Sequence, residues 1–270
     1  MGGGSYDPIV SRSRSVSYQR KSREEVFSQR HIDPQMNPKE ISIRESRDSE
    51  EHPESFPIII ALDETGSMGH IPELIIKNVL PDIMESIMNA GVKDSQICFM
   101  GIGDCCFSEE APLQVGQFES SDELMEKWLT KVYLESRGGG NGTESYPLAW
   151  YFASRHVVTD AWEKRQQKGV LITIGDESCQ RVLLKEQLEK YIGDHPEADI
   201  PSSELLERVR EKWNVFHIHC NGGSYRASET NWEKLLGSNL VVSVESDGMD
   251  IKDIIPRLIV GCYRKPESDE

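Results

Sequence analysis

Five short, largely apolar runs alternate with amphipathic segments from residue 57 onward. The runs cover residues 58–62, 97–102, 170–174, 215–219 and 240–242. Apolar runs of this length are typical of strands that are buried on both faces, as in a parallel sheet. The segments between them place apolar residues at helical spacing. The pattern therefore predicts an α/β fold, in which a doubly wound, mostly parallel sheet is flanked by helices.

The predicted helices have clear start and stop signals. The first begins near Pro72, is kinked at Pro81 and stops at Gly91. The last helix carries its apolar residues between 251 and 259 and stops at Gly261. The remaining helical segments span 122–133, about 145–157, 181–192 and 203–212. A short edge strand is expected within 113–118.

The first 55 residues show neither helical nor alternating periodicity. Residues 1–23 are rich in Ser and Arg, and residues 24–55 become acidic. Such a segment has too little apolar area to offset the entropy of ordering the chain, so we expect a disordered or extended arm. The predicted division is an arm at 1–55, one folded domain at 56–265 and a short acidic tail at 266–270.

The chain is strongly acidic, with 46 Asp and Glu against 30 Lys and Arg and a formal net charge of −16. The arm holds nine basic and ten acidic residues, so nearly all of the excess belongs to the domain. A domain surface of this charge repels phosphate backbones and anionic lipids, which makes it a poor nucleic-acid or membrane binder. A small cation-filled pocket remains compatible with it.

No apolar run approaches the length needed to cross a bilayer, and the first residues lack the apolar stretch of a secretory signal. The six cysteines show no C-x-x-C spacing and lie mostly in apolar runs. They are therefore expected to be buried free thiols in a reducing compartment. The expected location is the cytoplasm.

Acidic residues stand where several predicted strands end. Asp63 closes the first run, Asp104 follows the second, and Asp176 follows the third. In sheets of this class, ligands bind beyond the carboxyl ends of the strands. This edge of the sheet is therefore the predicted site.

The segment after the first strand has the highest density of oxygen-bearing side chains. Asp63, Thr65 and Ser67 alternate along it, so that an extended chain presents them on one side, and Gly66 permits a tight turn. Thr143, at the end of a glycine-rich loop, supplies a further hydroxyl. Oxygen ligands of this kind suit a hard divalent cation, Mg²⁺ first, with Mn²⁺ or Ca²⁺ as alternatives.

This order of features resembles the von Willebrand factor A (VWA) domain and its metal-ion-dependent adhesion site. The resemblance rests on an apolar strand, the sequence Asp-x-Thr-Gly-Ser-Met, a kinked helix, a glycine-rich loop with Thr, and an apolar strand followed by Gly-Asp. It covers about residues 57–263 and implies a Rossmann-like fold. The metal ligands that it implies are Asp63, Thr65, Ser67, Thr143 and Asp176.

Two features depart from the family pattern. The usual Thr-Asp-Gly is replaced by Ile174, Gly175, Asp176 and Glu177, and the loop before Thr143 carries more glycine than is usual. Thr65, in place of the first Ser of the Asp-x-Ser-x-Ser element, is a frequent change that keeps the hydroxyl. Three further residues are candidates for lying behind the metal ligands or for contacting the bound partner: Asp104, Glu144 and His70. For His70 an ordinary role at the start of a helix is the simpler interpretation.

The favoured function is a non-enzymatic adaptor or scaffold of the intracellular type, which binds an acidic side chain of a partner protein through the bound cation. The resemblance implies an AAA-type ATPase as one partner class, because many intracellular relatives work beside such enzymes. One alternative is a metal-dependent phosphoester hydrolase that uses His70 as a base. Another is RNA association through the basic residues of 1–23.

Overall fold

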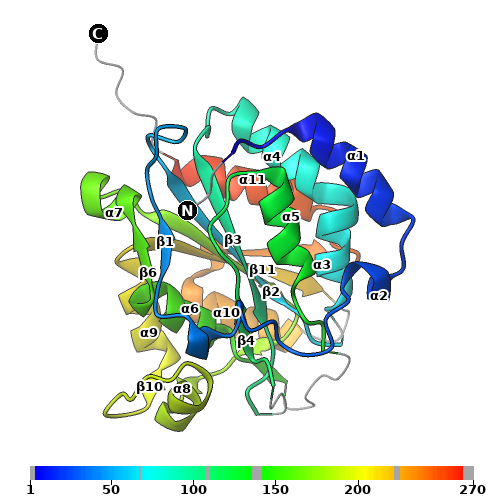
Figure 1. Cartoon of the computed structure of the whole chain (residues 1–270). Helices are drawn as coiled ribbons and strands as arrows, with labels where there is room; N and C mark the ends of the chain where they lie inside the picture. Colours follow the sequence, from blue (N-terminus) through cyan, green and yellow to red (C-terminus); the bar gives the residue numbers. More distant parts are fainter. Residues whose placement is uncertain (1–3, 67, 107–109, 136–141, 222–225, 264–270) are drawn as a thin grey trace.

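Six strands form one central sheet in the computed structural model, which describes residues 4–66, 68–106, 110–135, 142–221 and 226–263 (Figure 1). The strand order is β12-β11-β7-β2-β3-β4. All neighbours are parallel except β3 and β4, which are antiparallel. The prediction of a mostly parallel sheet flanked by helices is confirmed. The strands are β2 (Phe56–Asp63), β3 (Ser95–Ile102), β4 (Leu113–Val115), β7 (Gly169–Gly175), β11 (Trp213–Asn221) and β12 (Val241–Glu245).

Alternate residues of the central strands enter two separate cores, one on each face of the sheet. Ile58 and Ile60 pack on one face, whereas Ile59 and Ala61 pack on the other. The first face is covered by α3 (His70–Leu74), η2 (Ile75–Val79), α4 (Leu80–Asn89), α5 (Asp122–Thr130) and α11 (Ile251–Cys262). The second face is covered by α6 (Tyr146–Arg155), α8 (Lys185–Tyr191), α9 (Ser202–Arg210) and α10 (Arg226–Leu236).

The predicted kink at Pro81 takes the form of a π-helical turn, η2, between α3 and α4. The Leu80 N–H donates to the carbonyl of Ile75, five residues earlier. The Leu80 N–H is therefore not available to Ile76, and Pro81 has no N–H to donate to Lys77, so both carbonyls lack their usual α-helical donors. The helix therefore continues, but it leaves two backbone acceptors to be satisfied from outside.

The N-terminal arm is more ordered than its sequence indicates. Residues Pro8–Gln19 form helix α1, which lies against η2, α4 and α5 (Figure 1). Asp7 caps this helix by accepting hydrogen bonds from the backbone N–H groups of Ile9 and Val10. The expectation of a disordered or extended segment is thus corrected for these residues. The hydrophobic pattern did not predict this helix, because its buried residues are Ser11 and Ser15 and not apolar side chains.

The rest of the arm follows the domain surface. It contains α2 (Arg23–Val26), η1 (Pro38–Glu40) and β1 (Arg44–Ser46). Strand β1 pairs in parallel with β6 (Val157–Thr159) outside the central sheet. The division into 1–55 and 56–265 stays a prediction, and the predicted tail at 266–270 lies outside the described residues.

Several predicted elements differ in length from those observed. The edge strand expected at 113–118 is limited to Leu113–Val115. The helix expected at 181–192 is divided into β9 (Val182–Leu183) and α8, and β9 pairs with β10 (Ile200–Pro201). Helix α7 (Asp160–Arg165) was not predicted. No helix within the described part of the chain is long and apolar enough to cross a membrane.

Candidate metal centre

The two predicted carboxylate ligands follow neighbouring strands of the sheet. Strand β2 ends at Asp63, and β7 ends one residue before Asp176. The two strands are parallel, with Leu62 opposite Ile174, so both aspartates lie at the carboxyl edge of the sheet. The strand order also reverses here, because the chain passes from β2 to β3 on one side and later returns to β7 on the other. This is the place where folds of this class bind their ligands.

Asp63 is buried and organises the turn that follows it. Its Oδ1 accepts hydrogen bonds from the backbone N–H of Thr65 (3.0 Å) and from the Thr65 hydroxyl (2.6 Å). Burial, together with the neighbouring Asp176 carboxylate, raises the pKa of Asp63 to about 7. The structure therefore brings Asp63 and Thr65 together as expected, whereas Ser67 lies outside the described residues.

A tyrosine that the sequence did not indicate completes the environment of Asp63. The Tyr146 hydroxyl donates to Asp63 Oδ2 at 2.9 Å, from the first turn of α6. This approach depends on Gly175, because a Cβ atom at that position would lie 1.8 Å from the Tyr146 hydroxyl oxygen and 2.9 Å from Asp63 Oδ2. In the sequence, Gly175 was only part of the Gly-Asp pair that stands where the family has Thr-Asp-Gly. Its physical role is to leave room for this hydrogen bond.

A short strand pair brings the predicted Thr143 to the same edge. Strand β5 (Thr143–Glu144) pairs in parallel with β8 (Ser178–Cys179), and Thr143 lies opposite Ser178. Because Ser178 is only two residues after Asp176, this pairing holds Thr143 near the end of β7. Most of the predicted glycine loop before it, 138–141, lies outside the described residues.

Glu144 is a buried acid of the centre whose carboxyl group is incompletely hydrogen-bonded within the described residues. It is buried, and its Oε2 has no hydrogen-bond partner among the described residues. Burial raises the pKa of its carboxyl group to about 10, and the carboxylates of Asp63 and Asp104 add to the effect. A buried acceptor without a donor costs free energy.

These observations test whether a divalent cation fits the centre. Buried carboxylates repel one another at one sheet edge, one buried carboxylate oxygen has no donor in the part of the chain that the structure describes, and hydroxyl side chains lie among them. A cation would supply the missing positive charge, and oxygen donors of this type match Mg²⁺, Mn²⁺ or Ca²⁺. The residues present therefore fit such an ion. Those that would hold it are Asp63, Thr65, Thr143 and Asp176, with Ser67 as the fifth predicted ligand.

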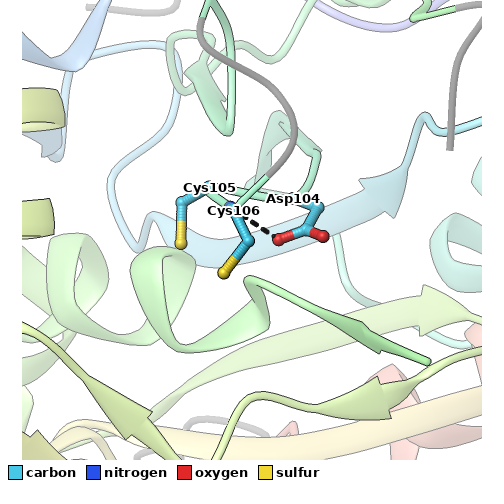
Figure 2. A group of neighbouring side chains, drawn as sticks. All are labelled: Asp104, Cys105 and Cys106. Carbon is cyan, nitrogen blue, oxygen red and sulfur yellow. Dashed lines mark hydrogen bonds between the residues drawn. The ribbon is translucent and has the colours of Figure 1, made fainter. Parts of the chain in front are cut away.

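Asp104 lies at the margin of this centre and forms a compact group with Cys105 and Cys106 (Figure 2). Its carboxylate accepts a hydrogen bond from the Cys106 backbone N–H at 2.8 Å. Burial raises the pKa of the Cys105 thiol to about 12, which disfavours the thiolate that a soft metal requires. We therefore assign Asp104 to the acidic surroundings of the centre and no metal to the cysteines.

His70 begins helix α3, as the simpler interpretation predicted. Its Nε2 lies 2.7 Å from the carbonyl oxygen of Ser246, in the segment after β12. This contact joins the start of α3, which follows β2, to the segment after the outermost strand, β12. Because a carbonyl oxygen only accepts, Nε2 carries the proton in this contact.

No family model matches the chain, and no characterised protein matches its sequence. Solved structures do match. The vWF domain of the type V pili tip protein Mfa5 from Porphyromonas gingivalis is 8% identical, with a TM-score of 0.52, over 80% of this chain and 99% of that one. The pilus adhesin SpaC from Lactobacillus rhamnosus GG, in its open conformation, is 10% identical, with a TM-score of 0.52, over 76% of this chain.

Proximal thread matrix protein 1 from the mussel byssus is also similar, at 13% identity and a TM-score of 0.50 over 77% of this chain. The chain spans 30% of the length of SpaC and 48% of the length of the mussel protein. At these identities the similarity shows the fold alone. The chain has the VWA fold, as its sequence predicted.

Proposed function

From the VWA fold and the acidic centre at its sheet edge, we propose that this chain is a metal-dependent protein-interaction module. The observation that carries the proposal is the buried carboxylate of Asp63 beside that of Asp176, with the buried Glu144 near them, whose Oε2 has no hydrogen-bond partner among the described residues. Such a group is costly without a cation, and it lies where VWA-type sheets present their ligand-binding edge. The proposed occupant is Mg²⁺.

The residues of the chain have distinct tasks in this proposal. Asp63 and Asp176 supply negative charge, and the hydroxyls of Thr65 and Thr143, with that of Ser67, supply neutral oxygens. Tyr146 fixes the orientation of the Asp63 carboxylate through its hydroxyl. When bound, the cation supplies positive charge that can attract a carboxylate of a partner. The proposed partner is a protein with an accessible Asp or Glu.

The two alternatives have less support at the level of the residues. A hydrolase needs a base beside the cation, and the contact that the structure gives for His70 directs its Nε2 to the Ser246 carbonyl, in the segment after β12. RNA binding needs accessible cations in the arm, but three of the five basic residues of 1–23 pair with acids of the domain: Arg12, Arg14 and Arg23. These contacts favour the interaction module. An AAA-type ATPase and a cytoplasmic location stay within the proposal as what the family resemblance suggests.

Mg²⁺ should stabilise the protein, because a ligand that binds the folded state alone shifts the unfolding equilibrium. We expect the midpoint of thermal unfolding to rise on addition of Mg²⁺ and to return to its starting value with EDTA. The Asp63→Asn variant should lose this shift. Asp253→Asn, an exposed aspartate on α11, is the matched control and should keep it. Identical unfolding curves in Mg²⁺ and EDTA for the wild type would refute the proposed centre.

A further inference from the structure

A cavity of about 480 Å³ opens beside the candidate metal centre. It lies between β8, the start of α9 and the side of α10, and Gly142 and Thr143 form part of its wall. Thr143 is also one of the predicted metal ligands. The cavity therefore adjoins the centre, and one extended ligand can occupy both.

The charge of this cavity differs from that of the rest of the molecule. The chain has 46 acidic residues, yet none of the described residues that line the cavity is acidic. Two of them, Arg181 and Lys234, are basic and exposed. Neither forms an ion pair within the described part of the chain, whereas Arg12, Arg14 and Arg47 all do. An acidic protein that keeps two unpaired cations around one opening favours an anion there.

The uncharged groups of the wall are suited to the same type of ligand. Ser203 and Asn231 are exposed in the cavity and carry hydrogen-bond donors. Helix α9 begins in the wall at Ser202 without a side-chain cap, so the positive end of its dipole also points to this region. Donors and cations thus surround the opening together.

We propose that this cavity binds a second acidic side chain of the same partner whose first carboxylate is bound at the metal centre. The partner segment would be an extended acidic peptide, with one carboxylate at the cation and another paired with Arg181 and Lys234. This inference rests on the proposed function for its first anchor, but the cavity has its own residues and can be tested separately. Two anchors on one segment raise affinity, because the second contact is made intramolecularly.

Two synthetic peptides separate the two anchors. The first is a fluorescent decapeptide of glutamate with an amidated C-terminus. Ten extended residues span roughly 33 Å, so any spacing between the centre and the cavity is available to it. The second carries one glutamate among glycines and serines and reports on the metal centre alone. Both are titrated with the full chain by fluorescence anisotropy, in Mg²⁺ and in EDTA, at constant ionic strength.

The test variant is Arg181→Gln/Lys234→Gln, and the control is Lys252→Gln/Arg257→Gln. The control removes the same charge from α11, on the other face of the sheet. We expect the test variant to lose about fivefold to tenfold of its affinity for the glutamate decapeptide, since each exposed ion pair contributes modestly. Its affinity for the single-glutamate peptide and its thermal shift with Mg²⁺ should stay unchanged. The control variant should bind both peptides like the wild type.

An equal loss in both double variants would mean a bulk charge effect and would overturn the cavity proposal. So would unchanged decapeptide affinity in the test variant, or no binding of the decapeptide by the wild type. Failure of the single-glutamate peptide to bind in Mg²⁺ would instead contradict the proposed function. Decapeptide binding that is lost in the test variant but insensitive to EDTA would support the cavity while contradicting docking at the metal.

Discussion

Gly175 shows how one residue decides whether the centre can form. Its missing side chain lets the Tyr146 hydroxyl reach Asp63, and the Tyr146 ring is fixed in turn by edge contact with Trp232 at 5.0 Å between ring centroids. The tyrosine lies 83 residues after the aspartate to which it donates. No local motif connects them. The pair becomes visible only when α6 is placed on the sheet.

Replacing Gly175 by alanine should therefore destabilise the protein by about 1–3 kcal/mol or more, because the new Cβ overlaps a fully buried side chain. The added Tyr146→Phe change removes the closest atom and should recover part of the loss. The control is Gly261→Ala in α11, where a Cβ meets nothing within 4 Å. Urea unfolding of the wild type, Gly175→Ala, Tyr146→Phe and the double variant measures the coupling, and strictly additive effects would disprove the assigned contact.

The ligand residues were predictable to the extent that they follow strands. Asp63 and Asp176 end or follow apolar runs, and the topology of a parallel sheet places such residues together. The burial of Glu144 was not predictable, because its position depends on the pairing of β5 with β8. Two-residue strands leave no periodic pattern in a sequence. Local sequence patterns could not reveal the contact of Tyr146 with Asp63 or the burial of Glu144, because both depend on tertiary contacts.

At the scale of elements, α1 and the kinked helix form one unit. The carbonyls of Ile76 and Lys77 lack their usual donors at the π-helical turn. They accept hydrogen bonds from the side chains of Ser15 (3.1 Å) and Gln19 (3.0 Å), which lie four residues apart on α1. The arm thus satisfies the backbone groups that Pro81 leaves open. The sequence predicted the kink at Pro81 but not the donors from α1, because Ser and Gln four residues apart are equally common on an exposed helix.

Removing these donors should loosen the arm. We expect Ser15→Ala/Gln19→Ala to lower the free energy of unfolding by about 1–3 kcal/mol, since it leaves a buried carbonyl without a partner. Ser13→Ala/Ser17→Ala changes exposed residues of the same helix and controls for the gain in helix propensity. Limited proteolysis at the arm should speed up in the first variant only. Equal stability of the two variants would show that the hydrogen bonds from Ser15 and Gln19 to the kinked helix do not stabilise the protein.

At the scale of the whole molecule, basic side chains of the arm form ion pairs with acidic side chains of the domain. Arg14 pairs with Asp122 and with Glu126, and Arg12 pairs with Asp82 and with Glu85. The sequence indicated only that the arm was nearly neutral while the domain held the excess acid. The structure adds that arginines of the arm lie against acidic residues of α4 and α5. Arg12 and Arg14 of the arm therefore act within the chain, as partners of acidic side chains on the domain.

The far end of the arm is held by charge as well, and this gives the molecule a predictable response to acid. Asp48 accepts hydrogen bonds from both terminal nitrogens of Arg165, at 2.8 and 3.0 Å, and from the Ser55 hydroxyl at 2.8 Å. Partial burial alone would raise the pKa of Asp48, but these donors, with Lys164, hold it well below its usual range. A carboxyl whose pKa is lower in the folded than in the unfolded state stabilises the protein fully above its unfolded value, near 4. That contribution is lost as the pH falls toward the folded value.

Asp48→Asn should therefore lower the free energy of unfolding at pH 7 by about 1–3 kcal/mol, through the loss of charged hydrogen bonds to Arg165. The difference from the wild type should begin to narrow below about pH 4, because there the unfolded wild type takes up a proton that the folded state still resists. Glu50→Gln, an exposed acid in the same segment, should follow the wild type at every pH. Denaturant unfolding between pH 7 and pH 3 measures all three. A difference that stays constant below pH 4 would show that Asp48 stabilises by packing and not by its charge, and the arm would then be held to the domain without an acid-sensitive link.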